Sequence, residues 1–337
     1  MIRRIVMMGT AAAAAAVALA GCGGGSSSST ATPTPTSSPT PTPTPTPTYT
    51  AFPLTAAAEF NTLNATTSYT GDPATGAVTL GVTATETLTT RVKLATAPDV
   101  TTGTYVFDEA AEESRFTNTN ILVTPVTTAL EFSFRSTNTA TGALAGNFAQ
   151  LELLNNTSNK AITTATDALL GSLTTVSYAN WWRGDSTTGQ KRLTYSVWGY
   201  PTLTYDVPTT GTASYTTRIV GRAISVANNA TTLTRVGGTA TVSVNFATGL
   251  VTTTLNLTRV PDSGAETAYT TLSAQAAIPI GLNQFNGSFV SGGAATGTIA
   301  GSFYGLQGAN IGVVFGASGT INGADTRIVG ELVGKKQ

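Results

Sequence analysis

The sequence predicts an all-β protein in which an irregular antiparallel sheet domain precedes an eight-stranded antiparallel β-barrel, both after a signal peptide and a disordered Pro/Thr linker. Three observations predict this fold. From Ala51 onward the chain is rich in Thr, Ala, Gly and Val, and apolar residues alternate with polar ones over short segments. Gly, Asn, Asp and Pro interrupt these segments at short intervals, as the turns of antiparallel sheets do. Helical periodicity is scarce, so no helical layer is expected.

The first element, residues 1–21, has the pattern of a secretory signal peptide. A basic start precedes an apolar run over Ile5 to Ala20 that is too short and too rich in alanine to span a bilayer stably. The run ends in Leu19-Ala20-Gly21-Cys22, which resembles the lipobox of bacterial lipoproteins and implies lipidation of Cys22. Gly23 follows instead of Asp, which by resemblance to the enteric sorting pattern favours the outer membrane. The alternative is that Cys22 is an incidental thiol.

The second element, residues 22–50, is predicted to be a stalk. Glycines and serines follow the cysteine, and residues 32–48 mostly alternate Pro with Thr. This composition cannot build a core, and the Pro-Thr part favours polyproline II at about 3.1 Å per residue. The stalk therefore reaches on the order of 50 Å or more from the lipid.

The third element, residues 51–205, is predicted to be a separate sheet domain with long polar connections. Two short helical segments are expected within it. One is a helical turn over 108–116, because its Asp-Glu-Ala-Ala-Glu-Glu sequence favours helix, and the other covers 160–173 around Asp167. The domain boundary is placed near Pro201 to Pro208, where Pro, Asp and Gly break the strand pattern.

The fourth element, residues 206–337, is predicted to be the barrel. Gly238 to Phe246 alternates small or polar residues with apolar ones, and Ala247-Thr248-Gly249 supplies a hairpin turn. The same pattern recurs along this part of the chain. The expected strands are 212–220, 238–246, 250–260, 270–278, 284–290, 295–303, 309–319 and 326–332. Eight strands close a small barrel whose interior is filled by side chains.

The composition excludes several classes of function. The chain has no histidine and one cysteine, which excludes a Ser-His-Asp triad, a histidine-ligated metal or haem, and an internal disulfide. Basic and acidic residues balance at 17 each and are scattered, so the chain lacks the basic surface that nucleic acid requires. We therefore expect no nucleic-acid partner, no metal and no cofactor.

Paired carboxylates occur at Asp108-Glu109 and Glu112-Glu113. One hypothesis is that they are catalytic, because glycosidases act through two carboxyl groups. A solvated charged turn beside Arg115 accounts for the same pattern, and we favour it. No catalytic residue is assigned, and the protein is predicted not to be an enzyme.

Five residues are candidates for ligand binding. The adjacent Trp181 and Trp182, followed by Arg183, could stack on a flat ligand or anchor a protein interface. The alternative is that one tryptophan fills the core of the sheet domain while the other covers its joint with the barrel. Tyr200 and Tyr304 are also candidates, since a tyrosine can ligate ferric haem. Their alternative role is to bridge core and surface.

Two stretches resemble the lobes of transferrin-binding protein B and related surface lipoproteins. Val197 to Thr202 with Val207 to Tyr215 is similar to the family's passage into its barrel, and Gly301 to Gly316 is similar to its C-terminal strand-turn-strand motif. Three positions depart from the family pattern: Leu306 replaces proline, Asn310 replaces glutamate and Val313 replaces glycine. The resemblance implies one lobe, made of a handle domain and an eight-stranded barrel.

These features together predict an outer-membrane lipoprotein that is exposed to the cell exterior, monomeric and tethered through its lipid. The resemblance implies that it binds an extracellular protein or a small solute, with iron or haem acquisition as the process and an outer-membrane transporter as a further partner. The alternative from another class is a structural or adhesive envelope lipoprotein without soluble cargo. A haem-binding module is a third hypothesis.

Overall fold

The computed structural model describes residues 46–337 apart from 110–111, 124–128, 138–147, 159–166 and 185–188. The signal peptide, Cys22 and most of the stalk therefore lie outside the described residues. Within them the chain consists of antiparallel strands with only short helical turns, which confirms the all-β prediction. In this part of the chain, no helix has the length and apolar character needed to cross a membrane.

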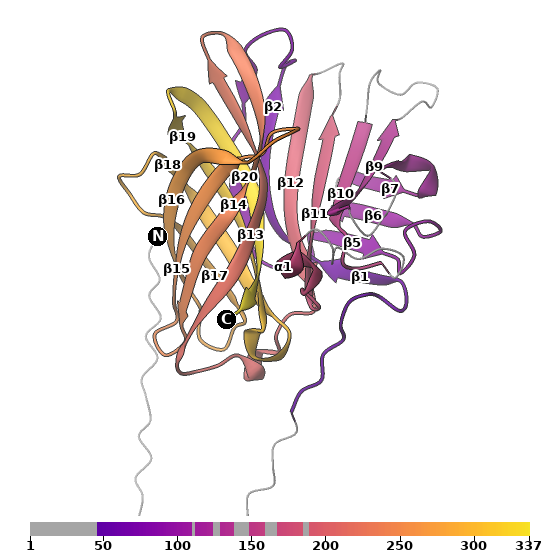
Figure 1. Cartoon of the computed structure of the whole chain (residues 1–337), viewed down its shortest axis with the longest axis vertical. Helices are drawn as coiled ribbons and strands as arrows, with labels where there is room; N and C mark the ends of the chain where they lie inside the picture. Colours follow the sequence, from indigo (N-terminus) through magenta and orange to yellow (C-terminus); the bar gives the residue numbers. More distant parts are fainter. Residues whose placement is uncertain (1–45, 110–111, 124–128, 138–147, 159–166, 185–188) are drawn as a thin grey trace, which may run out of the picture. The chain divides into compact units, whose positions relative to one another are not determined.

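The C-terminal strands form a closed barrel (Figure 1). Each strand pairs antiparallel with the next, and the last pairs with the first. The strands are β13 (Thr212–Ala227), β14 (Ala230–Asn245), β15 (Leu250–Arg259), β16 (Thr267–Ala277), β17 (Gln284–Phe289), β18 (Ala295–Tyr304), β19 (Asn310–Ile321) and β20 (Ala324–Lys336). The predicted eight-stranded barrel is confirmed.

Two antiparallel sheets precede the barrel, and we call residues 51–205 the handle. The smaller sheet has the order β1-β5-β6-β7, and the larger has the order β3-β2-β12-β11-β10-β9-β8 with β4 also paired to β2. The strands are β1 (Ala58–Asn61), β2 (Leu63–Thr70), β3 (Thr79–Leu80), β4 (Ala84–Glu86), β5 (Val92–Thr96), β6 (Tyr105–Glu109), β7 (Glu112–Phe116), β8 (Ile121–Val123), β9 (Glu131–Thr137), β10 (Phe148–Leu154), β11 (Val176–Gly184) and β12 (Gln190–Gly199).

In the part of the chain that the structure describes, helical structure is limited to single turns. They are η1 (Asn118–Asn120), α1 (Ala168–Gly171), η2 (Thr204–Asp206) and η3 (Leu306–Gly308). The carboxylate of Asp167 accepts a hydrogen bond from the Leu170 amide and so caps α1. The expected helix over 160–173 is thus helical at 168–171, and residues 160–166 of that prediction lie outside the described residues.

The predicted helical turn over 108–116 is wrong, because residues 108–109 and 112–116 lie in the paired strands β6 and β7, while residues 110–111 lie outside the described residues. Phe107 and Ser114 are buried on one side of the hairpin, whereas Asp108 and Glu113 are exposed on the other. This alternation with a period of two buries an apolar face against the larger sheet. Burial therefore overrides the local helix propensity of the acidic and alanine residues.

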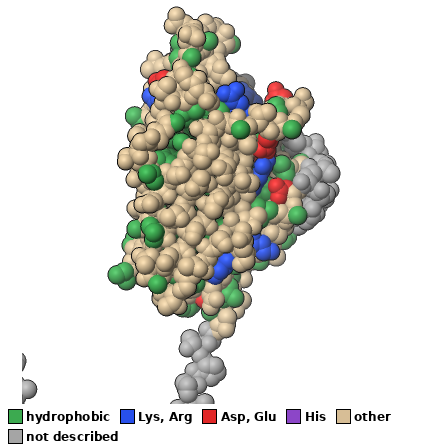
Figure 2. Space-filling view, turned by 60° about the vertical axis from the view of Figure 1, so that its left-hand side comes forward, with side chains coloured by type: hydrophobic (Ala, Val, Ile, Leu, Met, Phe, Trp, Pro, Cys, Tyr) green, Lys and Arg blue, Asp and Glu red, His purple; other side chains and the backbone are tan. Residues whose placement is uncertain are grey.

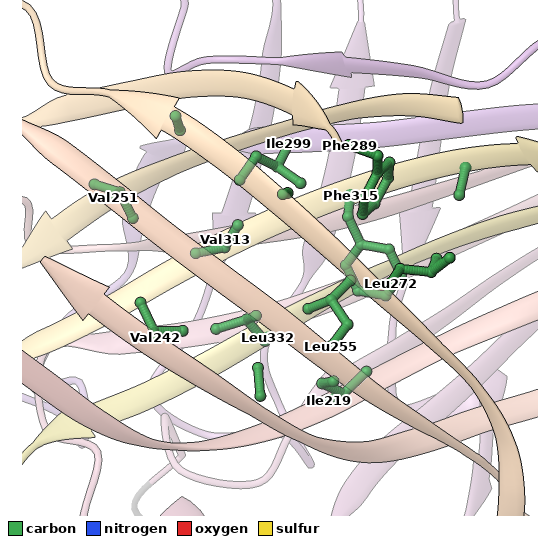
Figure 3. Close-up of a cluster of buried hydrophobic side chains, with 14 of the residues drawn as sticks. Ile219, Val242, Val251, Leu255, Leu272, Phe289, Ile299, Val313, Phe315 and Leu332 are labelled. Carbon is green, nitrogen blue, oxygen red and sulfur yellow. The ribbon is translucent and has the colours of Figure 1, made fainter. Parts of the chain in front are cut away.

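The barrel interior is packed with side chains (Figure 3). Leu255, Leu272, Phe315 and Leu332 come from four different strands and meet near the centre. These side chains alternate along each strand with residues that point outward. The barrel therefore has a solid core, as predicted.

The handle packs against one side of the barrel, and the two form one compact unit. Val314, Val329 and Val333 point out of the barrel into an apolar cluster that includes Tyr195 and Val197 of β12. Figure 1 shows β12 beside the barrel strand β20. This contact explains why β19 and β20 are buried on both faces along most of their length, in contrast to β15 and β16, which have one solvated face.

Candidate functional site

Trp181 lies in the core between the two sheets of the handle. It has no exposed surface, its indole Nε1 donates a hydrogen bond of 3.0 Å to Ser114 Oγ, and its ring centroid is 4.7 Å from that of Phe107. Protein atoms therefore enclose this side chain on all sides. This position agrees with the alternative interpretation of the sequence, in which one tryptophan fills the core of the sheet domain.

Trp182 points to the opposite face of the same sheet, toward the barrel. The guanidinium carbon of Arg222, on β13, lies 4.8 Å from its ring centroid, and the Phe148 ring stands perpendicular to it at 5.5 Å. Trp182 is half-buried and packs against the cluster that handle and barrel share. It therefore covers the joint, as the packing alternative expects, while ligand binding by either tryptophan stays a prediction.

Arg183 connects the two handle sheets through ion pairs. Its guanidinium donates to Glu109 Oε1 at 3.0 Å and to Glu112 Oε2 at 2.6 Å. Burial lowers the pKa of Arg183, and the two carboxylates partly counter that shift. The network continues outward, since Arg91 pairs with Glu109 at 3.1 Å and Arg192 with Glu112 at 2.7 Å. Glu113 pairs with Arg115, so three of the four acids in the paired-carboxylate pattern neutralise arginines.

The two candidate tyrosines are packed by aromatic and aliphatic neighbours. Tyr304 is fully buried, and burial raises its pKa far above the ordinary value, which disfavours the phenolate that ferric haem requires. Tyr200 is half-buried, and its ring centroid lies 5.3 Å from those of Phe52 and Phe60. A haem-binding role for either residue remains a prediction. Within the described residues, no group of three or more Cys, Asp or Glu side chains could hold a metal ion.

An open cleft of about 760 Å³ lies where the handle meets the barrel wall. Handle residues around β4 line one side, and residues of β17 and β18 line the other. The lining residues are Thr85, Glu86, Thr87, Thr89, Thr90, Arg91, Asn286, Gly287, Thr298, Ile299 and Ala300. Sequence reasoning missed this cleft, because a run of threonines between weak strands has no pattern that predicts a binding site.

Hydrogen bonds to the barrel fix the handle side of this cleft. Thr85 Oγ1 donates to Thr298 Oγ1 at 2.7 Å, and the Leu88 amide donates to Gln284 Oε1 at 2.9 Å. Arg91 reaches the cleft with 41% of its side chain exposed and pairs with Glu86 at 2.5 Å. The cleft therefore presents hydroxyl groups and an exposed ion pair, and hydrogen bonds to the barrel hold its handle side in place.

The barrel wall beside the cleft is polar but carries few charges. Figure 2 shows this wall as mostly uncharged, with Lys, Arg, Asp and Glu side chains gathered mainly along its right-hand margin and at its top. Its outward positions include Thr241, Thr254 and Ser273, which are direct neighbours across three strands. The charged surface is therefore concentrated away from the centre of the wall.

Residues 207–336 match a family model described as the C-lobe and N-lobe β-barrels of transferrin-binding protein B, which confirms the resemblance in the barrel. No curated protein matches the sequence. Solved structures similar to the chain include transferrin-binding protein B from Haemophilus parasuis Hp5, at 12% identity over 85% of this chain and 77% of that one, with a TM-score of 0.41. They also include the haemoglobin receptor HpuA from Kingella denitrificans, at 16% identity over 86% and 90% of the two chains, with a TM-score of 0.38.

Proposed function

We propose that this chain, whose barrel is of the transferrin-binding protein B type, is a surface lipoprotein that captures an extracellular protein without catalysis. In this proposal Cys22 carries the lipid, residues 22–50 form the stalk, and handle and barrel together face the cell exterior from the outer membrane. The captured protein then passes to an outer-membrane transporter. The monomer is the functional unit.

The packed barrel interior is the observation that favours a protein over a small solute. Eight-stranded barrels either fill their interior with side chains or enclose one small ligand. Here Phe285, Phe303 and Phe315 are fully buried inside the barrel and leave its interior filled. Binding must therefore occur on the outer surface, where a protein partner can cover the large area that a stable complex needs.

The junction cleft is our candidate for the centre of that surface. It combines an exposed arginine with hydroxyl groups from both handle and barrel, so a partner docked there contacts both parts at once. Arginine is enriched among the residues that dominate protein interfaces, because its fork of donors makes several directed hydrogen bonds. Arg91 is thus the first residue to test.

The first prediction concerns transferrin, the protein for which the matched family is named. We expect the full chain, immobilised on a biosensor, to bind iron-loaded or iron-free transferrin, and Arg91→Glu to weaken binding at least about tenfold, as loss of an interface anchor does. Arg115→Glu is the matched control, because Arg115 is also an exposed arginine paired to a glutamate but lies on β7 outside the cleft. It should bind as the parent does.

Two results would contradict the proposal in different ways. If Arg91→Glu and Arg115→Glu weaken binding equally, the cleft is not the centre of the binding surface. If the chain binds neither transferrin nor any protein from growth medium, under iron-replete and iron-starved conditions alike, a structural or adhesive envelope role becomes the better explanation.

A further inference from the structure

One end of the barrel carries an exposed apolar rim, formed by the loops at 203–209, 246–250, 278–282 and 305–308. Six large apolar side chains of these loops are exposed: Leu203, Tyr205, Leu250, Ile280, Leu282 and Leu306. Ile280 is completely exposed, and 76% of Tyr205 is exposed. Between the loops lies a cleft of about 350 Å³ with Val207, Phe246 and Ile278 in its lining. Such a concentration of exposed apolar groups marks an interaction surface.

Backbone hydrogen bonds hold the rim loops in place, so the apolar tips do not fold back onto the barrel. The Leu282 amide donates to the Pro279 carbonyl at 3.1 Å, and the Ile278 amide donates to the Gly249 carbonyl at 2.8 Å. On the other side of the rim, the Gln307 amide donates to Asp206 Oδ2 at 2.9 Å. The rim is therefore a formed surface.

The chain enters the folded unit at this same rim. Tyr49 Oη donates to Asp206 Oδ2 at 2.8 Å and accepts a hydrogen bond of 2.9 Å from the Leu203 amide. In Figure 1 the indigo chain enters from below, the side on which the C-terminus of the barrel lies. Cys22 precedes Tyr49 by 27 positions, so a lipid on Cys22 would tether the protein through its apolar rim.

Two lysines adjoin the rim at the end of β20. The Lys336 amide donates to the Ala309 carbonyl at 2.9 Å and its Nζ reaches the Gln307 carbonyl at 3.3 Å, while Lys335 is exposed. Asp206 is the acid within these loops, and Tyr49 and Gln307 both donate to its carboxylate. Apolar side chains beside basic ones are the combination that binds the interface of an anionic bilayer.

We propose that this rim rests on the anionic lipid surface of the membrane to which the protein is anchored, with Ile280 and Leu282 inserted at the level of the headgroups. The proposal extends the proposed function, because it takes the lipid on Cys22 as the first attachment. Because Cys22 precedes Tyr49 by 27 positions, a lipid on Cys22 keeps the rim near the membrane at a raised effective concentration, so a weak intrinsic affinity is enough for contact. The lipid then holds the protein at the membrane, and the rim determines which face of the folded unit meets the surface.

The test uses residues 22–337 with Cys22→Ser, which lack the signal peptide and cannot be acylated, in flotation with phosphatidylethanolamine–phosphatidylglycerol vesicles. We expect the protein to float with these vesicles at millimolar lipid. Adding Ile280→Ser and Leu282→Ser should reduce the partition coefficient at least about tenfold, because two apolar anchors are lost. Lys335→Gln with Lys336→Gln should remove the preference over neutral phosphatidylcholine vesicles.

The matched control is Val82→Ser with Val290→Ser, which removes two exposed apolar side chains outside the rim. It should float like its parent, and the melting temperatures of all variants should agree. Failure of the parent to float, or equal flotation of the Ile280/Leu282 variant, would overturn the proposal. So would a dimer in sedimentation velocity that only the Ile280/Leu282 variant abolishes, because a second copy would then cover the rim.

The lipid anchor has a separate readout. Cells grown with labelled palmitate should label the wild-type chain but not Cys22→Ser. Absence of label on the wild-type chain would disprove the anchor of the proposed function, whereas the flotation result would still decide whether the rim binds lipid.

Discussion

Trp181 and Trp182 point to opposite faces of one strand, because successive side chains of a β-strand alternate. Trp181 is enclosed by the handle core, and its indole is held by Ser114 and covered by Arg183, whose guanidinium carbon lies 3.5 Å from the ring centroid. Trp182 keeps part of its surface in solvent. The same residue type at adjacent positions therefore contributes differently to stability.

We expect Trp181→Ala to lower the free energy of unfolding by about 3–5 kcal/mol, because it leaves a cavity and removes the partner of Ser114. Trp182→Ala should cost roughly half as much or less, since its side chain is only partly removed from water. Urea unfolding followed by far-UV circular dichroism gives both values. Equal costs for the two variants would show that the joint with the barrel matters as much as the handle core.

The alternation that separates the two tryptophans can be read from the sequence, but the partners of Arg183 cannot. Glu109 and Glu112 lie more than 70 positions earlier on a hairpin of the other sheet. No local pattern pairs residues across that distance. Only the packing of the two sheets brings the three charges together.

At the scale of single elements, the barrel strands were the most predictable part of the molecule. β17 and β18 begin at the predicted residues Gln284 and Ala295, because the first residues of these strands alternate between the core and the solvated face. β13 and β14 run farther than predicted, to Ala227 and from Ala230. Their extra residues pair with each other beyond the predicted strands, where the apolar alternation is weak.

The β18–β19 pair depends on a glycine at the point of closest approach. Gly297 has φ +147°, and a Cβ there would lie 2.0 Å from the carbonyl oxygen of Gly316 on the paired strand. Both the backbone conformation and the lack of space exclude other residues. By contrast, Gly293 in the preceding turn has no backbone restriction of this kind, and a Cβ there would make only ordinary contacts.

Gly297→Ala should therefore lower the free energy of unfolding by roughly 2 kcal/mol or more, since the strands must separate or the backbone must change conformation. Gly293→Ala should change it by less than about 0.5 kcal/mol, as expected for an unstrained surface position. Guanidinium unfolding of the two variants tests the difference. If Gly297→Ala leaves the free energy of unfolding unchanged, β18 and β19 can move apart at this position at little cost.

At the scale of the whole molecule, the junction of handle and barrel encloses carboxyl groups. Glu331 is fully buried on β20 between the outward-facing Val329 and Val333. Burial, reinforced by Glu131 of β9 and Glu152 of β10, raises the pKa of Glu331 well above its usual range. Burial likewise raises the pKa of Glu131 to about 7.

Four other titratable groups that interact with these carboxyls come from four further strands. They are Tyr178 of β11, Tyr195 of β12, Arg222 of β13 and Arg235 of β14. Arg235 pairs with Glu131 at 3.8 Å, with 54% of the arginine side chain exposed. The two arginines lower the pKa of Glu131, but burial and Glu152 outweigh them.

These raised pKa values make the stability of the whole unit depend on pH in a defined direction. In the unfolded chain both carboxyls ionise near their ordinary pKa of 4.5, whereas the folded protein keeps them protonated to higher pH. Between about pH 4.5 and 7 the unfolded state therefore binds fewer protons, and the free energy of unfolding falls as pH rises. At pH 8 both carboxyls are ionised in the unfolded chain, so the free energy of unfolding is lowered by the cost of burying them.

Glu331→Gln removes the titration and keeps the shape of the side chain. We expect it to be more stable than the wild type at pH 8, close to it at pH 4.5, and less dependent on pH between these values. Thermal unfolding across this range measures the effect, and Glu113→Gln, which changes an exposed glutamate, is the control. If Glu331→Gln is instead less stable at pH 8, Glu331 is ionised in the fold and its pKa is not raised as burial predicts.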